Sequence, residues 1–466
     1  MQENDNATLS AQREELLDAE LLAELLSERK FTQIRVMMQK LLAPDIAELF
    51  ENISHSQCAL IFRLLPKELA AEVFVEMDAD LTRHIINSFS DSELCDILDE
   101  LYIDDTVDII EEMPASVVKR ILRNSSPEDR AIINRILRYP KDSAGTVMTT
   151  EYVRFIGNMT VEAALAHVRR VAIDKETIYN CYVTDKNRHL LGVVTAKDLL
   201  ISNLDALLED LMDDNVISVN TSDDKEEVAG KLEKYGLLAM PVVDSENRLV
   251  GIVTLDDAIS VIKEESEEDF AKMAAITPTE KPYLKTSVLQ IFLARVPWLL
   301  ILMISSTISG AILTGFEAAL PAVLVLFVPM IMGTGGNSGG QASVTVTRSI
   351  SLSELKFSDL PRVFFKEIRV GIMCGLTLGV VTFVKVILID KLLLGISGIS
   401  LTVAAVVSLS LAATIIIAKI IGAILPIVAK KIHLDPAVME SPLITTLVDA
   451  VSLLVYFFVA SSILSL

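Results

Sequence analysis

The sequence predicts a multidomain membrane protein with four parts: an all-α superhelical N-terminal domain, a duplicated α+β unit, a connecting helix and a five-helix α transmembrane domain. Three observations predict this organisation. First, the chain has 466 residues, which suits about three domains. Second, its mean hydropathy of +0.47 is high for a soluble protein, although its net charge is −22. Third, one segment of the chain is repeated.

Charge and hydropathy divide the chain near residue 280 into an acidic half and an apolar half. Residues 281–466 contain 13 Lys and Arg and 8 Asp and Glu, a net charge of +5. The first 280 residues therefore hold 28 basic and 55 acidic residues, a net charge of −27. A field of this sign repels phosphate and attracts cations, which excludes a nucleic-acid-binding protein. The four cysteines form no CxxC pair, so buried thiols in a reducing cytosol are expected.

Residues 1–140 predict a helical repeat. Helix-start signals recur about every 12 residues, at Pro66, Asp78, Ser90, Asp104, Pro114 and Ser126. A regular repeat of paired helices predicts a superhelical solenoid. The first residues lack a basic segment followed by an apolar core, so no signal peptide is expected and this domain is expected in the cytoplasm.

Residues 141–204 and 205–263 are predicted to be two copies of one α+β unit. GVVTAKD at 192–198 matches GIVTLDD at 251–257, an offset of 59 residues. Each copy reads as helix, strand, strand and helix, with the two strands joined as a hairpin. Thr195, Asp198 and Thr254 fall at strand-to-helix turns, where they could contact the ribose and phosphates of a nucleotide. A scaffold that binds no nucleotide is an equal alternative.

Residues 264–284 are predicted to form an acidic amphipathic helix that connects the duplicated unit to the membrane. The acidic residues of this helix and of two earlier clusters are Glu264, Glu265, Glu267, Glu268, Asp269, then Asp104, Asp105, Asp108, then Asp256 and Asp257. Each cluster alone is typical of a solvated helix face. Together they would repel one another unless a divalent cation lay between them, and its binding would shift a conformational equilibrium.

Five apolar segments are each long enough to cross a membrane, at about residues 286–316, 321–347, 367–389, 396–429 and 441–464. The connections at 348–369 and 429–440 are basic, so both are expected on the cytoplasmic side. This pattern predicts a multi-pass protein of the cell inner membrane, with its N-terminus in the cytoplasm and its C-terminus outside.

Asp449 lies inside the fifth apolar segment, about eight residues from its start, where an unpaired carboxylate costs at least ~2.5–3.5 kcal/mol. We interpret it as a cation site in a water-filled pathway. The alternatives are a protonated aspartate that is hydrogen-bonded between helices, and an ion pair with Lys385 or Lys419. A two-fold dimer would bring two copies of Asp449 to its axis.

The second apolar segment contains Pro329 and the stretch GTGGNSGGQ at 333–341. These residues predict a departure from helical geometry that lines a cavity, with Asn337 offering an amide oxygen. Close helix packing through small residues is the alternative. Carboxylate, amide and carbonyl oxygens are hard ligands that suit Mg²⁺ or Ca²⁺.

Over essentially its whole length the chain resembles the MgtE-type family of magnesium channels and transporters. The resemblance rests on the duplicated unit, which is similar to a tandem CBS pair, and on RYPKDSAGTVM at 138–148, PMIMGTGGNSGGQASVTVTR at 329–348 and LDPAVMESPLITTLVDAVSLL at 434–454. It implies a homodimer with an acidic N domain, a CBS pair, a connecting plug helix and five transmembrane helices per chain. It leaves open whether the CBS pair binds ATP.

The resemblance also implies roles for matching residues. Asp449 and Asn337 would line a Mg²⁺ pore, and Asp435 at its cytoplasmic mouth would share Mg²⁺ with Glu268 and Asp269 of the plug helix. The implied sensor residues for regulatory Mg²⁺ are Glu72, Asp104, Asp108 and Asp257. Gly236 and Ser260 stand where a relative has acids, which leaves the number of sensor sites open.

The implied function is Mg²⁺-selective, channel-like influx that closes when cytoplasmic Mg²⁺ binds between N-domain, CBS and plug-helix acids. The sequence has no G-x-x-x-x-G-K-[ST] phosphate loop and no expected catalytic residue, so an enzyme is not expected. Two alternatives stay open: a transporter of other divalent cations such as Co²⁺ or Ca²⁺, and a non-conducting, membrane-anchored sensor of nucleotide or Mg²⁺.

Overall fold

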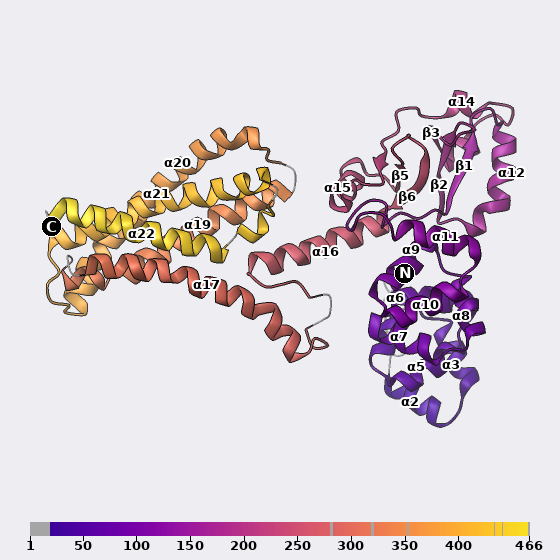
Figure 1. The fold of residues 1–466 in the computed structure, drawn as a ribbon, viewed down its shortest axis with the longest axis horizontal. Helices are drawn as coiled ribbons and strands as arrows, with labels where there is room; N and C mark the ends of the chain where they lie inside the picture. The colour runs from indigo at the N-terminus through magenta and orange to yellow at the C-terminus, as the bar shows by residue number, and fades with distance from the viewer. Residues whose placement is uncertain are drawn as a thin grey trace, which may run out of the picture. The chain divides into compact units, whose positions relative to one another are not determined.

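The structure, a computed structural model, describes residues 19–279, 283–317, 321–351, 354–432, 434–439 and 441–464. They belong to two compact units, Met1–Ile262 and Lys263–Leu466, and each unit has hydrophobic cores of its own (Figure 1). The first unit contains the acidic half of the chain, and the second contains the apolar half.

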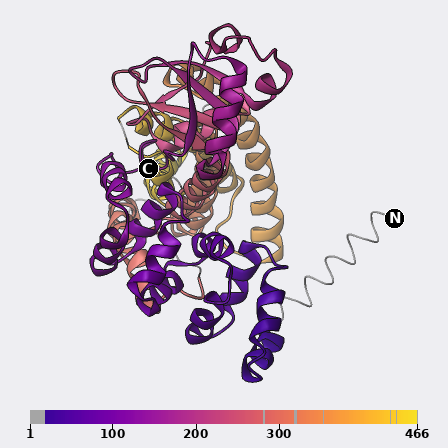
Figure 2. The ribbon, with the colours of Figure 1, turned by 90° about the vertical axis from the view of Figure 1, so that its right-hand side faces the viewer.

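The N-terminal domain is a run of short helices (Figure 2). They are α2 Ala19–Ser27, α3 Phe31–Met38, α4 Ala43–Glu51, α5 His55–Phe62, α6 Lys67–Glu76, α7 Ala79–Ser88, α8 Asp91–Leu98, α9 Ile103–Glu112, α10 Ala115–Asn124 and α11 Pro127–Ile136. The side chains of Asp78, Ser90 and Ser126 cap the first turns of α7, α8 and α11, as their sequence positions predict. Asp104 is an exception, because α9 begins one residue earlier, after Tyr102.

These helices pack in the alternating order of a solenoid. Helix α4 contacts α6, α6 contacts α8 and α8 contacts α10, while α5 contacts α7 and α9 contacts α11. Each helix therefore buries its apolar face against the second helix along the chain and not only against its neighbour. The all-α superhelical domain that the sequence predicts is confirmed.

The two copies of the duplicated unit fold alike. The elements of the first are β1 Tyr152–Ile156, α12 Val161–Val171, β2 Thr177–Thr184, β3 Leu190–Thr195 and α13 Ala196–Ile201. The elements of the second are α14 Leu208–Leu211, β4 Val219–Asn220, α15 Lys225–Tyr235, β5 Ala239–Val243 and β6 Leu249–Thr254, followed by α16 Leu255–Met273. The sheet orders are β1-β2-β3 and β4-β5-β6, each with one parallel and one antiparallel pair. The hairpins are confirmed, whereas sequence analysis missed β1 and β4, which are short and pair with strands distant in sequence.

The motif RYPKDSAGTVM joins the helical domain to the second copy. Ala144 and Gly145 donate backbone hydrogen bonds to the carbonyls of Asp223 (2.7 Å) and Thr221 (2.9 Å). A Cβ atom at Gly145 would lie 2.5 Å from the ring of Tyr139, so only glycine fits this approach. The helical domain and the second copy of the duplicated unit consequently share one hydrophobic core.

The predicted connecting helix over 264–284 is not a separate element. It is the second half of α16, which runs without interruption from Leu255 and ends at Met273. No glycine or proline lies between these residues, so nothing ends the helix after the duplicated unit. The same helix therefore carries Asp256 and Asp257 in its first turn and Glu268 and Asp269 near its end.

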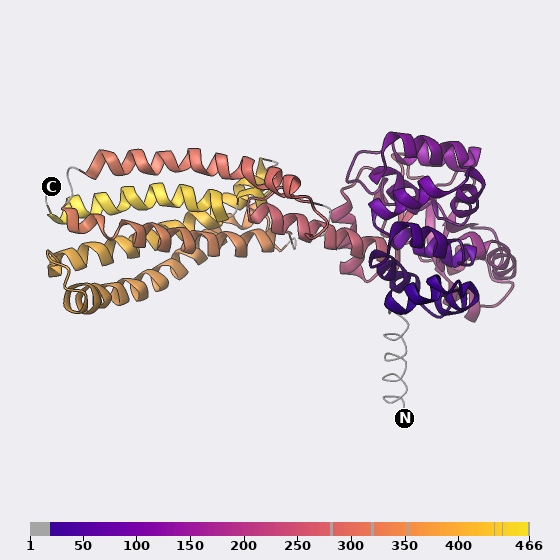
Figure 3. The ribbon, with the colours of Figure 1, turned by 90° about the horizontal axis from the view of Figure 1, so that it is seen from below.

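The second unit has five helices that are long and apolar enough to cross a membrane, among the described residues (Figures 1 and 3). They are Val288–Phe316, Ala322–Ser351, Phe357–Leu393, Leu401–Lys431 and Pro442–Leu464. The elements that form them are α17 Val288–Glu317, α18 Ala322–Val325, α19 Val328–Ser351, η2 Phe357–Asp359, α20 Leu360–Lys385, the π-helix η3 Val386–Leu393, α21 Leu401–Lys431 and α22 Ser441–Leu464, with η4 Ala437–Met439 before α22. Five spans were predicted, but the third helix starts at Leu360 and not at 367, because a helix continues through its charged first turns.

The glycine-rich stretch does not break its helix, which corrects the predicted departure from helical geometry. Helix α19 is continuous from Val328 to Ser351. Its glycines serve close packing instead: a Cβ at Gly422 of α21 would lie 2.1 Å from the carbonyl oxygen of Gly339 of α19. A Cβ at Gly335 would lie 2.7 Å from Ser452 of α22. The backbones of α19, α21 and α22 approach each other through these small residues.

Substitution of Gly422 tests this packing. Gly422→Ala would place a methyl group against the Gly339 carbonyl, so the helices would have to separate at a cost of about 1–3 kcal/mol or more. We expect a lower midpoint of thermal unfolding for the purified full-length protein in detergent. The control is Gly310→Ala in α17, where no other atom lies within 4 Å of the added Cβ. Equal stability of both variants would contradict the packing role.

Candidate ion pathway and acidic regulatory sites

Six carboxyl groups of the first unit form what we call the acidic cluster: Asp104, Asp105, Glu151, Glu176, Asp256 and Asp257. Helix α9 of the helical domain supplies the first two. Glu151 and Glu176 precede β1 and β2 of the first copy, and the last two begin α16 after the second copy. The cluster therefore joins the three parts of the unit, and its negative charges help to raise the pKa of Asp104, Asp105 and Glu176.

Burial and mutual repulsion keep protons on part of this cluster. Asp104 is buried, and burial followed by the charge of Asp105 raises its pKa well above the usual range. Burial and the charge of Asp257 raise the pKa of Asp105 to about 6 and that of Glu176 to about 8. Oδ1 of Asp104 and Oε2 of Glu176 are buried without a hydrogen-bond partner in the described chain. A nearby cation would lower the free energy of the ionised cluster.

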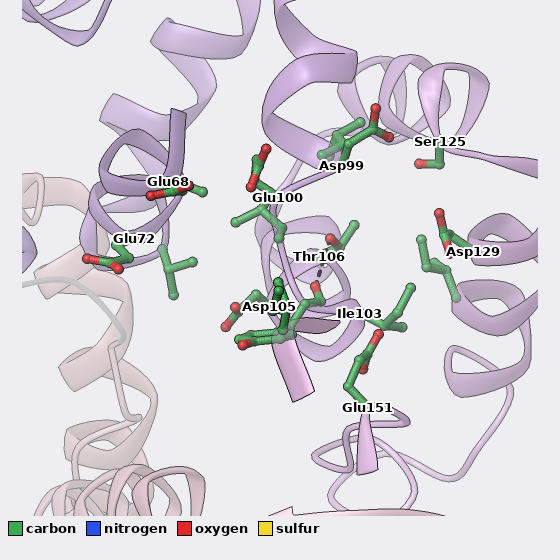
Figure 4. Close-up of a pocket in the computed structure, with 17 residues that line it drawn as sticks. Glu68, Glu72, Asp99, Glu100, Ile103, Asp105, Thr106, Ser125, Asp129 and Glu151 are labelled. Atoms are coloured by element: carbon green, nitrogen blue, oxygen red, sulfur yellow. Dashed lines mark hydrogen bonds between the residues drawn. The ribbon is translucent and has the colours of Figure 1, made fainter. Parts of the chain in front are cut away.

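A cavity of about 640 Å³ lies beside the cluster (Figure 4). Seven carboxylates line it, and none of the described lining residues is Lys, Arg or His: Glu68, Glu72, Asp99, Glu100, Asp105, Asp129 and Glu151. Figure 4 shows these side chains around the cavity, with Glu68 and Glu72 coming from α6 and Asp105 from α9. The cavity offers hydrated cations a strongly negative space.

The four implied sensor residues fall in different places. Asp104 and Asp257 belong to the acidic cluster, and Glu72 lines the cavity. Asp108, one turn after Asp104 on α9, is exposed. Sequence analysis missed Glu151 and Glu176, which are single acids in unremarkable local sequence and join the cluster only through packing. The adjacent residue Asp105 was part of a noted cluster but was not selected.

The predicted nucleotide contacts have a local structural role. Oγ1 of Thr195 donates a hydrogen bond to Oδ2 of Asp198 at 2.5 Å, and the pair forms a capping box that begins α13. Oγ1 of Thr254 likewise donates to Oδ2 of Asp257 at 2.5 Å. The repeated Thr and Asp therefore fix both strand-to-helix turns. Gly236, which stands where a relative has an acid, ends α15 in the left-handed conformation that favours glycine, with φ 62°.

In the second unit, the end of α16 meets the base of the membrane helices. Nζ of Lys272 lies 2.5 Å from Oε1 of Glu268 and 2.6 Å from Oδ2 of Asp435. Oγ of Ser351, at the end of α19, donates a hydrogen bond of 3.4 Å to Oδ2 of Asp269. Glu268, Asp269 and Asp435, which the resemblance assigned to one mouth site, are thus brought together. Lys272, which sequence analysis did not select, supplies the positive charge between two of them.

Asp449 is half-buried on α22 and forms no ion pair among the described residues. Its Oδ1 atom is buried and has no hydrogen-bond partner in the part of the chain that the structure describes. Nζ of Lys385, one of the two alternative partners, instead lies 2.8 Å from Oδ2 of Asp390. Lys419, the other, is buried on α21 and forms no ion pair with Asp449 among the described residues.

Asn337 lies at the level of Asp449. Gly335 and Gly339 lie two residues to either side of it. A Cβ added at Gly335 would lie 3.3 Å from Val448, the residue before Asp449, and one added at Gly339 would lie 3.1 Å from Val448. Asn337 is exposed, at the centre of an exposed stripe of α19 that includes Gly333 and Gln341. The opposite face of α19 packs into the bundle.

Among the described residues, no group of three or more His, Cys, Asp or Glu side chains is arranged to hold a metal ion directly.

The raised pKa values of the acidic cluster predict how stability depends on pH. The pKa of Glu176 is about 8 in the folded protein, against an ordinary value of 4.5, so folding takes up a proton between these pH values. The contribution of Glu176 to the free energy of unfolding is therefore largest below pH 4.5. It falls, on the order of a few kcal/mol, as pH rises towards 8. We expect Glu176→Gln to remove part of this loss and the exposed-site control Glu233→Gln to leave it unchanged. Thermal unfolding of the full chain by circular dichroism between pH 5 and 8.5 measures both, and parallel curves for all three proteins would refute the assignment.

Three family matches cover most of the chain. Residues 41–142 match the MgtE intracellular N domain, residues 144–204 and 208–264 match CBS domains, and residues 328–459 match the MgtE family described as a divalent cation transporter. The chain is 35% identical over 446 residues to the magnesium transporter MgtE of Thermus thermophilus, covering 94% of this chain and 97% of that protein. It is 33% identical to the MgtE of Bacillus subtilis over 445 residues, 94% and 95% of the two chains.

Two solved structures resemble the first unit. One is a crystal structure of the soluble part of a magnesium transporter, with TM-score 0.50 and 32% identity over 55% of this chain and 99% of that one. The other is the cytosolic domain of the Mg²⁺ channel MgtE in complex with ATP, with TM-score 0.50 and 35% identity over 52% and 100%. Taken with the tandem CBS pair, the acidic helical domain and the five spans, these matches show that the chain belongs to the MgtE family of divalent cation transporters.

Proposed function

We propose that this protein carries Mg²⁺ through the membrane into the cytoplasm by a channel-like pathway, and so contributes to magnesium homeostasis. The observation that carries the proposal is Asp449, whose buried Oδ1 atom has no hydrogen-bond partner among the described residues of the membrane unit. An acid at membrane depth costs free energy, and for that reason such acids usually mark ion pathways. The relatives of similar length are named magnesium transporters.

The membrane potential is sufficient to drive entry. An inward-negative potential of 100 mV contributes about 4.6 kcal/mol for a divalent ion, twice the value for a unit charge. Asp449 attracts the ion without removing its inner water, and Asn337 at the same level offers an amide group to that water. The protein needs no catalytic residue for this, in keeping with a transporter family that is not enzymatic.

We infer that the working molecule is a homodimer. One carboxylate and one amide per chain are few ligands for a dication, and a two-fold axis beside α19 and α22 would double them. Helix α17 supports this inference because α22 is its main packing partner among the described elements, and it exposes most of its large apolar side chains, which need lipid or a second copy. The basic connections favour a cytoplasmic N-terminus and an extracytoplasmic C-terminus in the inner membrane.

We further infer that cytoplasmic Mg²⁺ closes the pathway. In the first unit, Mg²⁺ beside Asp104, Asp105 and Asp257 would offset the repulsion of the acidic cluster and stabilise contacts between the helical domain and the CBS pair. Helix α16 is continuous from Asp257 to the mouth acids Glu268 and Asp269, so a change at one end is carried to the other. At low Mg²⁺ the ionised cluster repels and the closed arrangement loses stability.

ATP at the CBS pair is a second regulatory ligand that we propose. The support is the related cytosolic domain that was solved in complex with ATP. In this chain Thr195, Asp198 and Thr254 stand at the strand-to-helix turns of the two copies, where a carboxylate could accept hydrogen bonds from the ribose hydroxyls of a nucleotide.

Loss of Asp449 is the direct test of transport. We expect Asp449→Ala to reduce Mg²⁺ uptake into proteoliposomes by at least tenfold, because the only acid near the centre of the fifth span is removed. Mg²⁺ flux is measured with an entrapped fluorescent indicator under an inward-negative potential. Competing Co²⁺ and Ca²⁺ in the same assay separate Mg²⁺ selectivity from general divalent transport.

The matched control for this assay is Ser462→Ala on the same helix, whose hydroxyl bonds only within its own helix, to the carbonyl of Phe458. It should transport as the wild type does. Undiminished flux through Asp449→Ala would remove the pore assignment, and a wild type that passes no divalent cation would favour a non-conducting sensor.

Charge removal in the acidic cluster tests regulation. We expect the double variant Asp105→Asn and Asp257→Asn to need at least threefold more cytoplasmic Mg²⁺ for half-closure, because fewer carboxylates attract the ion. Single-channel recording from inside-out patches measures the open probability against Mg²⁺. The control Asp210→Asn with Glu233→Gln removes two exposed acids outside the cluster. An unchanged half-closing concentration in the cluster variant would contradict Mg²⁺ bridging there.

A further inference from the structure

The base of the membrane unit has a cavity that the transport proposal does not use. Its volume is about 310 Å³, at the small end of the range of ligand pockets, which is roughly 300–1,000 Å³. An apolar floor is formed by Ile350 of α19, by Leu355 in the connection after it, and by Ile427 of α21. Three lysines and one aromatic ring complete its wall: Lys356, Lys430, Lys431 and Phe357. Apolar floor and cationic rim meet in one place, which is the pattern of an amphiphilic ligand site.

Two of the lysines are held in position by the cavity wall. Nζ of Lys431 lies 3.8 Å from the centre of the Phe357 ring. Nζ of Lys430 donates a hydrogen bond of 3.4 Å to the carbonyl of Ile350. These contacts orient both ammonium groups without neutralising them, because a ring face and a carbonyl carry no net charge.

Asp359, two residues after Phe357, already has partners of its own. Oδ1 of Asp359 lies 3.0 Å from Nη1 of Arg362, and its Oδ2 accepts a hydrogen bond from the backbone N–H of Lys356. Lys356, Lys430 and Lys431 form no ion pair with an acid among the described residues. The rim therefore has an excess of positive charge that a ligand could meet.

The position of the cavity along the helices is that of a lipid headgroup. Helix α21 has 31 residues and is about 46 Å long, longer than the hydrocarbon core of about 30 Å. Lys430 and Lys431 are its last two residues, and Lys356 precedes the first turn of the third span. The rim thus lies at the membrane surface, and the apolar floor lies on its hydrocarbon side.

We propose that this cavity binds one anionic phospholipid, with the phosphate between Lys356, Lys430 and Lys431 and the upper acyl chain on the floor of Ile350 and Ile427. Basic pockets between membrane helices at the cytoplasmic surface bind anionic headgroups in this way. A lipid there would tie the end of α19 to the end of α21. The proposal uses only the base of the membrane unit and does not depend on ion flux.

Lipid binding to the purified full-length protein tests the proposal. Native mass spectrometry and thermal unfolding in detergent would be followed during titration with phosphatidylglycerol, with phosphatidylcholine and with inorganic phosphate. We expect phosphatidylglycerol to bind and to raise the unfolding midpoint, and phosphatidylcholine to bind at least tenfold more weakly. The triple variant Lys356→Gln, Lys430→Gln, Lys431→Gln should lose at least tenfold in affinity for phosphatidylglycerol. Lys391→Gln, an exposed lysine at the opposite end of the membrane unit, should bind as the wild type does.

Other outcomes decide the question as well. The triple Lys-to-Arg variant keeps the charge and should retain binding, and the single variant Lys430→Gln gives an intermediate affinity if the triple Gln variant is unstable. Equal affinity of the triple Gln variant and the wild type would overturn the proposal, as would equal affinity for the two lipids. Competition by inorganic phosphate at the same concentration as the lipid would show a phosphate site with no role for the acyl chain, which also overturns it. Because flux is not measured, these failures are distinct from a failure of Mg²⁺ transport.

Discussion

Negative charge that the chain itself does not compensate is the constraint on which this protein depends. In the first unit, six carboxyl groups from three separate parts of the fold are packed so closely that burial raises the pKa of Glu176 to about 8. In the membrane unit, Asp449 has a buried oxygen without a hydrogen-bond partner among the described residues. Each arrangement is costly for the protein alone, and a cation beside it would lower that cost.

The acids at the base of the membrane unit, in contrast, are paired with a positive charge of the chain itself. Lys272 lies between Glu268 and Asp435, and although burial acts to lower its pKa, these two carboxylates raise it. This internal ammonium holds the end of α16 against the base of the membrane helices. The acidic cluster has no such ion pair among the described residues.

Close packing of the membrane helices fixes the positions of Asn337 and Asp449. Gly339 and Gly422 let α19 and α21 approach until a single added methyl group would meet a carbonyl oxygen at 2.1 Å. With one face of α19 engaged in this contact, the other face is left to present Asn337, and α22 presents Asp449 at the same level. Helix position, and hence the place of the two polar groups, is set by backbone contact and not by adjustable side chains. The packing around Asp449 offsets part of the free energy that burying its carboxylate costs.

The order of parts, the duplicated unit, the five spans and the exceptional position of Asp449 can be read from the sequence, because apolar length, repetition and a charge in an apolar run are local properties. Helix starts at Asp78, Ser90 and Ser126 can be read in the same way, since a cap acts within one turn. Three outcomes could not be read there: the glycines of α19 pack and do not break the helix, α16 is one helix ending at Met273, and Glu151 and Glu176 join Asp104 and Asp257. These outcomes depend on energies between segments that are distant in sequence. A glycine accepts either geometry until a neighbouring backbone selects one, and a lone acid has its pKa raised only when folding brings other acids beside it.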